Sequence, residues 1–368
     1  MEIDSKLKQI CQGFRIEGEY IGCEHIKVGN VNQTYKVTFR NPDGRWKSYI
    51  VQRVNTYAFR NPEQLMHNVD LITEHIRAKK QGQIALHFHH TGDRKNYIYD
   101  DEHGFWRLCN YIPSITYDGG TDEAVLRRTG EAFGEFQQLL SDIRVEELYE
   151  TIPDFHNTPK RLATLFADAE RDPKGRVKEV RAELDYIASV REEAEQLTRL
   201  YQQGELPLRV THNDTKINNV LFDRESSEAV AIIDLDTVMP GLVGSDFGDG
   251  VRFAANFVKE DSDHWEKAGV DLDRFRAFTE GFLSQTAGIL TETERRTLAL
   301  SVFTITVELA SRFLDDYILG DPYFKINYSD HNLVRTRCQL ALARDVKDKL
   351  PQMQAIVEEC WAAEQPCI

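Results

Sequence analysis

The chain has 368 residues, of which 41% are hydrophobic and 29% charged, and its formal net charge at pH 7 is −15. This length favours two lobes or domains over one small core, and the composition is that of an ordinary globular protein. The excess of acidic residues argues against nonspecific binding to nucleic acids or anionic membranes. A phosphate-binding site would therefore need local positive charge, from a metal ion, backbone N–H groups and a few cations.

No apolar run approaches the roughly 20 residues that span a bilayer, and residues 1–20 lack the apolar stretch of a signal peptide. The six cysteines are scattered without a Cys-x-x-Cys pair, which argues against a zinc site. We therefore expect a cytoplasmic protein with reduced thiols, and neither a nucleic acid nor a membrane as partner.

The first third of the chain predicts a β-rich region. Residues 1–20 indicate a short helix and a connector. Residues 22–55 contain the alternating runs TYKVTF and SYIVQRV, joined by the turn NPDG, which favour antiparallel strands. Residues 61–80 have apolar side chains at helical spacing. Two further strands are expected, ALHFHHT and then KNYIYDDEHGFWRLCNYI across a turn at residues 102–104.

From residue 122 the pattern becomes mainly helical. A helix with an apolar and aromatic core face is expected first, and residues 158–203 predict two highly charged amphipathic helices. Three strands follow over 206–212, 218–223 and 229–234, the third apolar enough to be buried. The rest of the chain predicts helices again.

These three strands carry a motif that suits phosphoryl transfer. RVTHNDTKINNVLFD has the order His-x-Asp-x-x-x-x-Asn, formed by His212, Asp214 and Asn219, and Asp234 ends the third strand. A carboxylate is needed to orient and deprotonate an attacking hydroxyl, and an amide and a second carboxylate to hold Mg²⁺ against ATP phosphates. We assign these roles to Asp214, Asn219 and Asp234. Lys216 is placed to reach the transferring phosphate.

Each residue also has a simpler interpretation, because His-x-Asp is common and Asp often ends a strand as a turn residue. Asp246-Phe247-Gly248 spells the magnesium-binding triplet of protein kinases, but it follows a Gly-rich segment. We expect Ser245 or Asp246 to cap a helix instead. Asp236 is a weaker metal candidate that could equally bond to loop backbone.

The first turn of the β region, residues 29–34, is a candidate phosphate cover, since backbone amides and small polar side chains there could surround a triphosphate. A lone Gly-Asn turn is usually just a hairpin, so the turn alone is a weak indication.

The layout resembles the kinase-like superfamily: a small β lobe with one helix, a linker near residue 110, and a larger helical lobe that carries the catalytic motif. It is most similar to the aminoglycoside phosphotransferase family of small-molecule kinases, and within it to kinases of N-acetylhexosamines. The resemblance implies an α+β, bilobal protein-kinase-like fold, with a β-rich N-terminal lobe over residues 1–109 and a mainly helical C-terminal lobe over 113–368. It is carried by NQTYKV, QRVNTYAFRNPEQLMHNVDLI, ETIPDFHNTPKR, LRVTHNDTKINN, AIIDLDTVMPG, DFGDGVRF, RFLDDY and DPYFKINYSDHNLVRTR.

The resemblance also implies ATP and Mg²⁺, and transfer of the γ-phosphate to the anomeric hydroxyl of N-acetylglucosamine or N-acetylgalactosamine. Asp214 matches the catalytic base, and Asn219 and Asp234 match the metal ligands. The expected nucleotide contacts are Asn30, Asn32, Thr34, Gln52, Asn110 and Ile112. The expected sugar contacts are Asn32, Asp214, Arg312 and Tyr323.

The chain departs from the wider kinase pattern in the strand SYIVQRV, where a phosphate-binding Lys pairs with an acid on the following helix. Gln52 stands at this position and Arg53 lies on the opposite strand face. Gln52 can hydrogen-bond a phosphate but brings no charge. No Lys–Glu pair is therefore assigned.

Alternatives remain open at this point. The acceptor of a kinase of this family could be an aminoglycoside, choline, homoserine or another sugar, and the overall acidity favours cationic acceptors. A catalytically inactive nucleotide-binding regulatory module is supported by Gln52 and opposed by the intact motif. Protein-kinase activity is disfavoured, because the helix expected at 246–257 leaves no long activation loop after Asp234.

Overall fold

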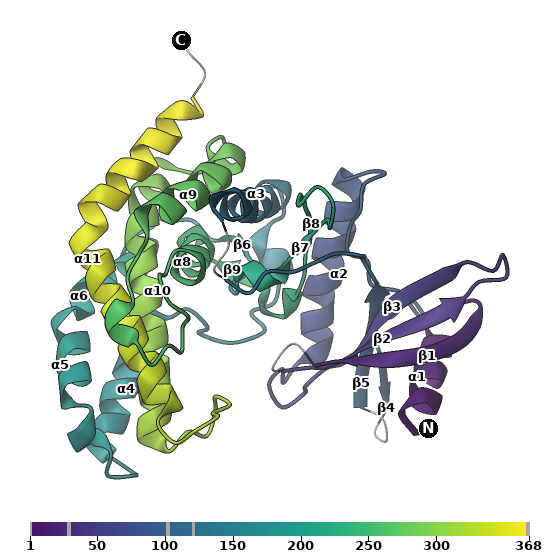
Figure 1. Ribbon diagram of the computed structural model, residues 1–368, viewed down its shortest axis with the longest axis horizontal. Helices are drawn as coiled ribbons and strands as arrows, with labels where there is room; N and C mark the ends of the chain where they lie inside the picture. Colours follow the sequence, from purple (N-terminus) through teal and green to yellow (C-terminus); the bar gives the residue numbers. More distant parts are fainter. Residues whose placement is uncertain (1, 28–30, 101–103, 120–121, 366–368) are drawn as a thin grey trace.

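The computed structural model describes residues 2–27, 31–100, 104–119 and 122–365. Figure 1 shows a small lobe built on a sheet, which contains the N-terminus, beside a larger helical lobe. The predicted α+β, bilobal fold is therefore confirmed. Strand β5 ends at Asn110 and helix α3 begins at Glu123; the division of the chain into residues 1–109 and 113–368 stays a prediction.

The N-terminal lobe is an antiparallel sheet in the order β1-β2-β3-β5-β4, covered by a helix on each face. Alternation along β5 separates the faces: Trp106 and Leu108 pack with α1, whereas Phe105 and Cys109 pack with α2. Arg107 therefore lies on the α2 face, toward the other lobe. The elements are α1 Glu2–Gly13, β1 Glu19–Ile26, β2 Gln33–Arg40, β3 Trp46–Arg53, α2 Pro62–Lys79, β4 Ile98–Asp100 and β5 Gly104–Asn110.

The strand predicted over ALHFHHT is wrong. Residues 85–91 form only an isolated bridge, between Phe88 and Cys109. The reason is that β4 already pairs with β5 at residues 104–106, and β3 occupies the other edge of β5, so only a short stretch of β5 is open to a further partner.

The C-terminal lobe is mainly helical, with two small two-stranded sheets at the side that faces the N-terminal lobe (Figure 1). Its helices are α3 Glu123–Leu139, α4 Thr158–Arg171, α5 Arg181–Ser189, α6 Arg191–Ala194, α7 Gln196–Gln202, α8 Val243–Ala254, α9 Leu272–Thr286, α10 Glu292–Leu319 and α11 His331–Ala363. Its strands are β6 Arg209–Thr211, β7 Val220–Phe222, β8 Ala229–Ile232 and β9 Met239–Gly241.

Three expectations for this lobe need correction. Residues 158–203 form four helices rather than two, because Asp172 and Gly175 adopt positive φ after α4 and the later helices are short. Strand β6 pairs with β9, which the sequence did not predict, while β7 pairs with β8. Strand β8 is half-buried rather than buried.

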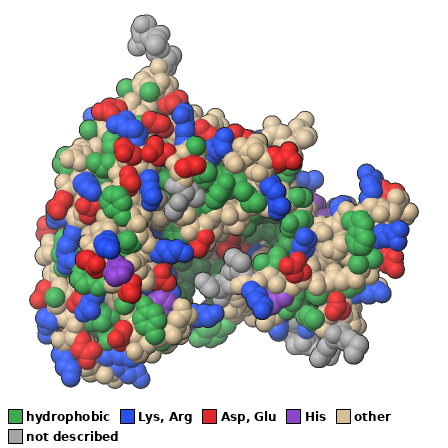
Figure 2. Space-filling model, viewed as in Figure 1, with side chains coloured by type: hydrophobic (Ala, Val, Ile, Leu, Met, Phe, Trp, Pro, Cys, Tyr) green, Lys and Arg blue, Asp and Glu red, His purple; other side chains and the backbone are tan. Residues whose placement is uncertain are grey.

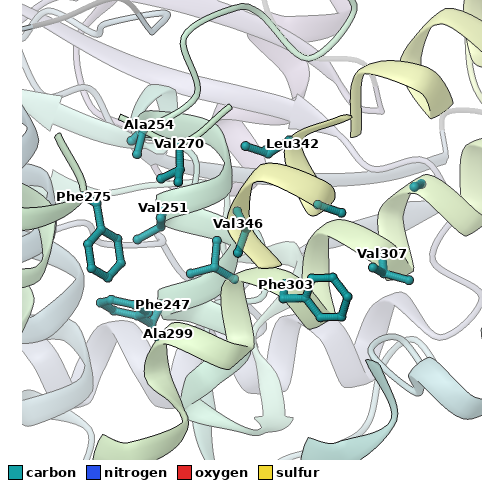
Figure 3. Close-up of a cluster of buried hydrophobic side chains, with 14 of the residues drawn as sticks. Phe247, Val251, Ala254, Val270, Phe275, Ala299, Phe303, Val307, Leu342 and Val346 are labelled. Carbon is teal, nitrogen blue, oxygen red and sulfur yellow. The ribbon is translucent and has the colours of Figure 1, made fainter. Parts of the chain in front are cut away.

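Helices α8 to α11 enclose the main core (Figure 3), in which Phe247, Val251, Phe275, Phe303 and Val346 are buried. Among the described residues, α10 is the one helix long and apolar enough to cross a bilayer by length and composition, although no apolar run of that length was expected. Of its most apolar stretch 78% is buried inside the lobe, so it is a core helix here.

Helices α3 and α9 approach closely because glycines stand at their crossing. A Cβ on Gly281 would lie 1.9 Å from the backbone oxygen of Arg127, and one on Gly130 would lie 2.1 Å from that of Phe278. Helix α3 reaches the central strands and α9 reaches the core, so this crossing joins the two parts of the lobe.

Candidate active site

The loop between β6 and β7, residues 212–219, is fixed by helix α8. The backbone N–H groups of His212 and Asn213 donate to the Asp246 carboxylate at 2.9 and 2.7 Å. Asp249, one turn further along α8, accepts another loop N–H at 3.0 Å. Both carboxylates are buried. The loop backbone is thus held by acceptors that water cannot replace.

This anchoring corrects the expected role of Asp246. Helix α8 begins at Val243, with Leu242 as its N-cap, so Ser245 and Asp246 lie inside the first turn and do not cap it. The Asp246 carboxylate also accepts from Gln137 at 2.7 Å. With three donors around it, Asp246 is a structural acceptor.

Asp214, Lys216 and Asn219 come together within the 212–219 loop. Lys216 Nζ lies 2.8 Å from Asp214 Oδ1, and Asn219 Nδ2 donates to Asp214 Oδ2 at 3.1 Å and to its backbone oxygen at 2.8 Å. Burial acts to raise the pKa of Asp214, but Lys216 outweighs it and the pKa is lowered. The charge of Asp214 in turn raises the pKa of Lys216. An ionised carboxylate and a protonated ammonium therefore lie side by side.

The β7–β8 hairpin brings Asp234 to the same region. The backbone N–H of Ile233 donates to the backbone oxygen of Asn219 at 2.9 Å, and the His212 ring bonds the backbone oxygen of Ile233 at 3.0 Å. His212 is wedged edge-on against Phe133 and Phe136. This histidine therefore holds the loop and the hairpin in register.

The Asp234 side chain is exposed to solvent. Figure 2 shows the hollow between the two lobes. Desolvation by the surrounding protein, followed by the negative charges of Asp236 and Asp214, raises the pKa of Asp234 to about 7. The site therefore has an excess of negative charge that a cation would relieve.

The residues present fit a hard divalent cation such as Mg²⁺. The amide nitrogen of Asn219 faces Asp214, which leaves its oxygen as a ligand atom beside the carboxylate of Asp234. Among the described residues no three His, Cys, Asp or Glu side chains gather as a metal site. Mg²⁺ does not need such a cage, because it is usually held by one or two carboxylates together with phosphates and water.

The predicted nucleotide contacts of the N-terminal lobe are bonded to one another and to Asp236. Asn32 Nδ2 donates to Asp236 Oδ2 at 2.6 Å, and its oxygen accepts the backbone N–H of Asn55 at 3.0 Å. Gln52 donates to the Thr34 hydroxyl at 3.1 Å. Asn30 lies outside the described residues. Asp236 thus bonds to side chains of the other lobe rather than to the loop backbone considered from the sequence.

The linker residues Asn110 and Ile112 have local partners. The Asn110 side chain accepts the N–H of His87 at 2.8 Å and donates to the Ala85 oxygen at 3.0 Å. The Ile112 oxygen accepts from the Ser114 hydroxyl at 2.9 Å. The Asn110 side chain therefore secures the linker. The nucleobase of a bound nucleotide would have to be held by the remaining backbone groups of the linker.

Arg312 and Tyr323, the predicted sugar contacts, have aromatic neighbours. The Arg312 guanidinium lies over the rings of Phe155 and Phe324, at 5.3 and 5.6 Å from their centroids. Tyr323 is 73% exposed and its ring contacts that of Phe324. Arg312 on α10 is thus held between two aromatic side chains, with Tyr323 beside it.

A histidine joins this aromatic region to the loop. His156 bonds Glu308 at 2.8 Å and the backbone oxygen of Asn213 at 3.3 Å. Arg161 is nearby: burial, followed by the charge of Arg312, lowers the pKa of Arg161. Two arginines and a histidine therefore lie near the buried carboxylate of Glu308, and the carboxylates of Asp249 and Asp315 act on His156 and Arg161.

Sequence reasoning missed Arg107, His156, Arg161 and Glu308. His156 and Arg161 stand in the block ETIPDFHNTPKR, which carried part of the resemblance, so that block was a usable signal. Arg107 and Glu308 are charged residues within apolar runs, which is itself unusual for residues at strand and helix interiors.

Residues 22–281 match the family described as the phosphotransferase enzyme family. This match covers more than half of the chain. The chain belongs to the phosphotransferase enzyme family. The predicted membership of a phosphotransferase family is therefore confirmed, while the acceptor is a separate question.

Solved structures of kinases resemble this phosphotransferase over nearly its whole length. A microcompartment-associated aminopropanol kinase is 13% identical, with 95% of this chain and 98% of that chain covered and a TM-score of 0.64. A spectinomycin phosphotransferase in complex with ADP and spectinomycin has 13% identity, coverages of 94% and 98%, and a TM-score of 0.58. A choline kinase from Cryptosporidium parvum Iowa II has 13% identity, coverages of 98% and 100%, and a TM-score of 0.56. The fold is that of small-molecule kinases.

Proposed function

We propose that this phosphotransferase is an N-acetylhexosamine 1-kinase, which transfers the γ-phosphate of ATP to the anomeric hydroxyl of N-acetylglucosamine or N-acetylgalactosamine. Family membership supports the phosphotransferase chemistry, and the similar structures with bound nucleotide support ATP as donor. The observation that carries the chemistry is the contact of Asp214 with Lys216 and Asn219 in one loop, with Asp234 beside them.

Asp214 has the properties of the base in this reaction. Its lowered pKa keeps it ionised, and a carboxylate has lone pairs left after bonding Lys216 and Asn219. It would orient the anomeric hydroxyl and accept its proton late in the transfer. Lys216, held protonated by Asp214, brings positive charge to the transferring phosphate.

Asn219 and Asp234 would hold Mg²⁺, which, when bound, neutralises charge on the nucleotide phosphates. The other groups of the site orient these two residues. His212 ties the loop to the hairpin, and Asp246 fixes the loop backbone. Most of the rate enhancement over the uncatalysed reaction should come from such positioning, because phosphoryl transfer demands little covalent chemistry from the protein.

The charges near the loop support a neutral sugar as acceptor rather than an amine. Arg161, His156 and Arg312 bring positive charge and hydrogen-bond donors. A cationic acceptor would need uncompensated carboxylates instead. Both oxygens of Glu308 are already bonded, whereas Asp315, which acts on Arg161, has one buried oxygen without a hydrogen bond and is the carboxylate that would favour an amine. An N-acetylhexosamine offers hydroxyl and carbonyl oxygens to such donors.

An acceptor comparison tests the proposal. ADP release is measured with N-acetylglucosamine, N-acetylgalactosamine, galactose and choline, and the product is examined by ³¹P NMR for a sugar 1-phosphate. Arg312→Met should raise the KM for the sugar about tenfold or more, since an oriented charged donor is lost. Arg344→Met is the matched control, because Arg344, on α11, lies over the ring of Tyr186 on α5, in another part of the lobe.

A second candidate is a kinase of an amino alcohol or aminoglycoside. The observation in its favour is the acceptor chemistry of the similar structures, which include aminopropanol and spectinomycin. Turnover of choline or spectinomycin with none of the hexosamines would select this candidate and reject the sugar. The absence of ADP release with every acceptor of either kind would favour the inactive regulatory module. We also propose a cytoplasmic location, because the described cysteines are free thiols.

A further inference from the structure

The N-terminal lobe has a buried cation at the position where its strand lysine is missing. In the β3–β5 pair, Gln52 stands directly opposite Arg107. Arg107 is 2% exposed, and its Nε donates to Gln52 Oε1 at 2.9 Å. The charge absent from position 52 is thus supplied by the neighbouring strand, on the same face of the sheet.

Arg107 reaches across to the other lobe. Its Nη1 bonds Asp236 Oδ1 at 2.5 Å, and Asn32 bonds the second oxygen of the same carboxylate. Two residues of the small lobe therefore hold one carboxylate of the large lobe. Asp236 is two residues beyond Asp234, so this contact fixes the segment that carries the proposed metal ligand.

The charge of Arg107 also matters for the phosphate end of the site. Arg107 pairs with Asp236 and Lys216 pairs with Asp214, while Asp234 stands two residues before Asp236, so two cations oppose three carboxylates. The excess of negative charge would repel nucleotide phosphates. Removing Arg107 would increase this excess of negative charge.

We propose that Arg107 is a positioning residue for the nucleotide: through Asp236 it holds the segment of Asp234 in place, and its charge offsets the carboxylates at the phosphate end of the site. This inference rests on the proposed function, since it assumes that nucleotide phosphates bind at Asp234. Lys36 is the competing cation on the same sheet face, but its ammonium lies 4.1 Å from the Tyr111 ring centroid, at the linker.

The test is isothermal titration with ADP in EDTA, where no metal contributes, followed by titration with Mg²⁺ and ADP. Arg107→Met should weaken metal-free ADP binding about tenfold or more, because a charge that opposes three carboxylates is lost. Asp236→Asn removes one carboxylate instead, so metal-free ADP should bind at least as tightly as to the wild type. Both variants should raise the Mg²⁺ requirement severalfold, because the Asp234 segment loses its anchor.

Arg107→Met and Asp236→Asn should thus have opposite effects on ADP binding if Arg107 acts by its charge. If the contact between Arg107 and Asp236 only supported the structure, both variants would bind ADP more weakly. Arg107→Lys keeps the charge but cannot reach both Gln52 and Asp236. It should bind metal-free ADP within about threefold of the wild type and still need more Mg²⁺. If Arg107→Met does not fold, Arg107→Lys and Asp236→Asn carry the test.

Arg209→Met is the control for loss of a largely buried ion pair, since Arg209 bonds Glu294 of α10. It should lower Tm and leave ADP binding unchanged. The inference would be overturned if Arg107→Met and Asp236→Asn weakened metal-free ADP binding equally. It would also be overturned if Lys36→Met lost ADP binding and Arg107→Met did not. A wild type that binds no ADP would reject the kinase function together with it. A wild type that binds ADP but phosphorylates no hexosamine would reject only the acceptor.

Discussion

Replacing Asp246 by Asn should damage both stability and turnover without changing the Mg²⁺ requirement. The Asp246 carboxylate is 1% exposed. Its Oδ1 accepts the backbone N–H of Asn213, and its Oδ2 accepts from His212 and Gln137. All three partners are donors, so an amide can satisfy them only in part.

The size of the effect follows from this hydrogen-bond geometry. The best orientation of the introduced amide keeps its oxygen toward His212 and Gln137 and turns its NH₂ toward the N–H of Asn213. One buried backbone donor loses its acceptor and a second buried donor is added. At about 1–3 kcal/mol for each unsatisfied donor, a loss of about 3 kcal/mol is expected. This corresponds to a fall in Tm of about 6–12 °C.

The assay is thermal unfolding together with kcat at varied Mg²⁺. A shifted 212–219 loop should lower kcat about tenfold or more. Asp223→Asn is the matched control: Asp223 also accepts three hydrogen bonds, but at an exposed turn where water can replace them. Asp234→Ala should raise the Mg²⁺ requirement. A wild-type Tm in Asp246→Asn, or a raised Mg²⁺ requirement like that of Asp234→Ala, would refute the anchoring role.

Three further outcomes are expected. Asp214→Asn should cut kcat about a hundredfold or more and leave the Kd of the sugar largely intact; near-normal kcat would exclude it as the base. Gly281→Ala should lower Tm strongly, because its Cβ would lie 1.9 Å from the Arg127 oxygen, whereas Gly288→Ala has open space and should change little. Burial opposes the charge of His156, but its carboxylate partner outweighs it and raises the pKa above 6.5. The charged His156 therefore stabilises the folded state fully below pH 6.5, and this stabilisation is lost as pH rises through the raised pKa. The Tm difference between wild type and His156→Gln should shrink from pH 6 to pH 9. A constant difference would contradict this.

The proposed catalytic motif could be found in the sequence because its parts are local. Asp214, Lys216 and Asn219 lie in one short loop, so their spacing alone brings them together once a strand enters the loop. Asp234 follows a strand that pairs with the preceding strand of the chain. Hairpin pairing is the most predictable kind of β contact, because few residues separate the partners.

The long-range contacts needed the tertiary structure. Strand β9 pairs with β6 across more than twenty residues, and Asp246 reaches back to His212 across thirty-four positions. Nothing in the local pattern of Asp246 distinguishes an anchor from a helix cap. The strand expected over residues 85–91 failed for the same reason: its pattern was suitable, but β4 already pairs with residues 104–106 of β5, and only an isolated bridge forms beyond them.

The sequence alone indicated β-rich and helical regions and the motif that suits phosphoryl transfer, because these depend on residue identity and short-range periodicity. The α+β class, and Gln52 where a lysine was expected, came from the family resemblance that the sequence carries. Only the tertiary structure placed Arg107 opposite Gln52 and against Asp236. It also set Arg312 between two aromatic rings from distant segments. The physical reason is that burial and charge pairing depend on which elements meet, and that is decided by the packing of the whole chain.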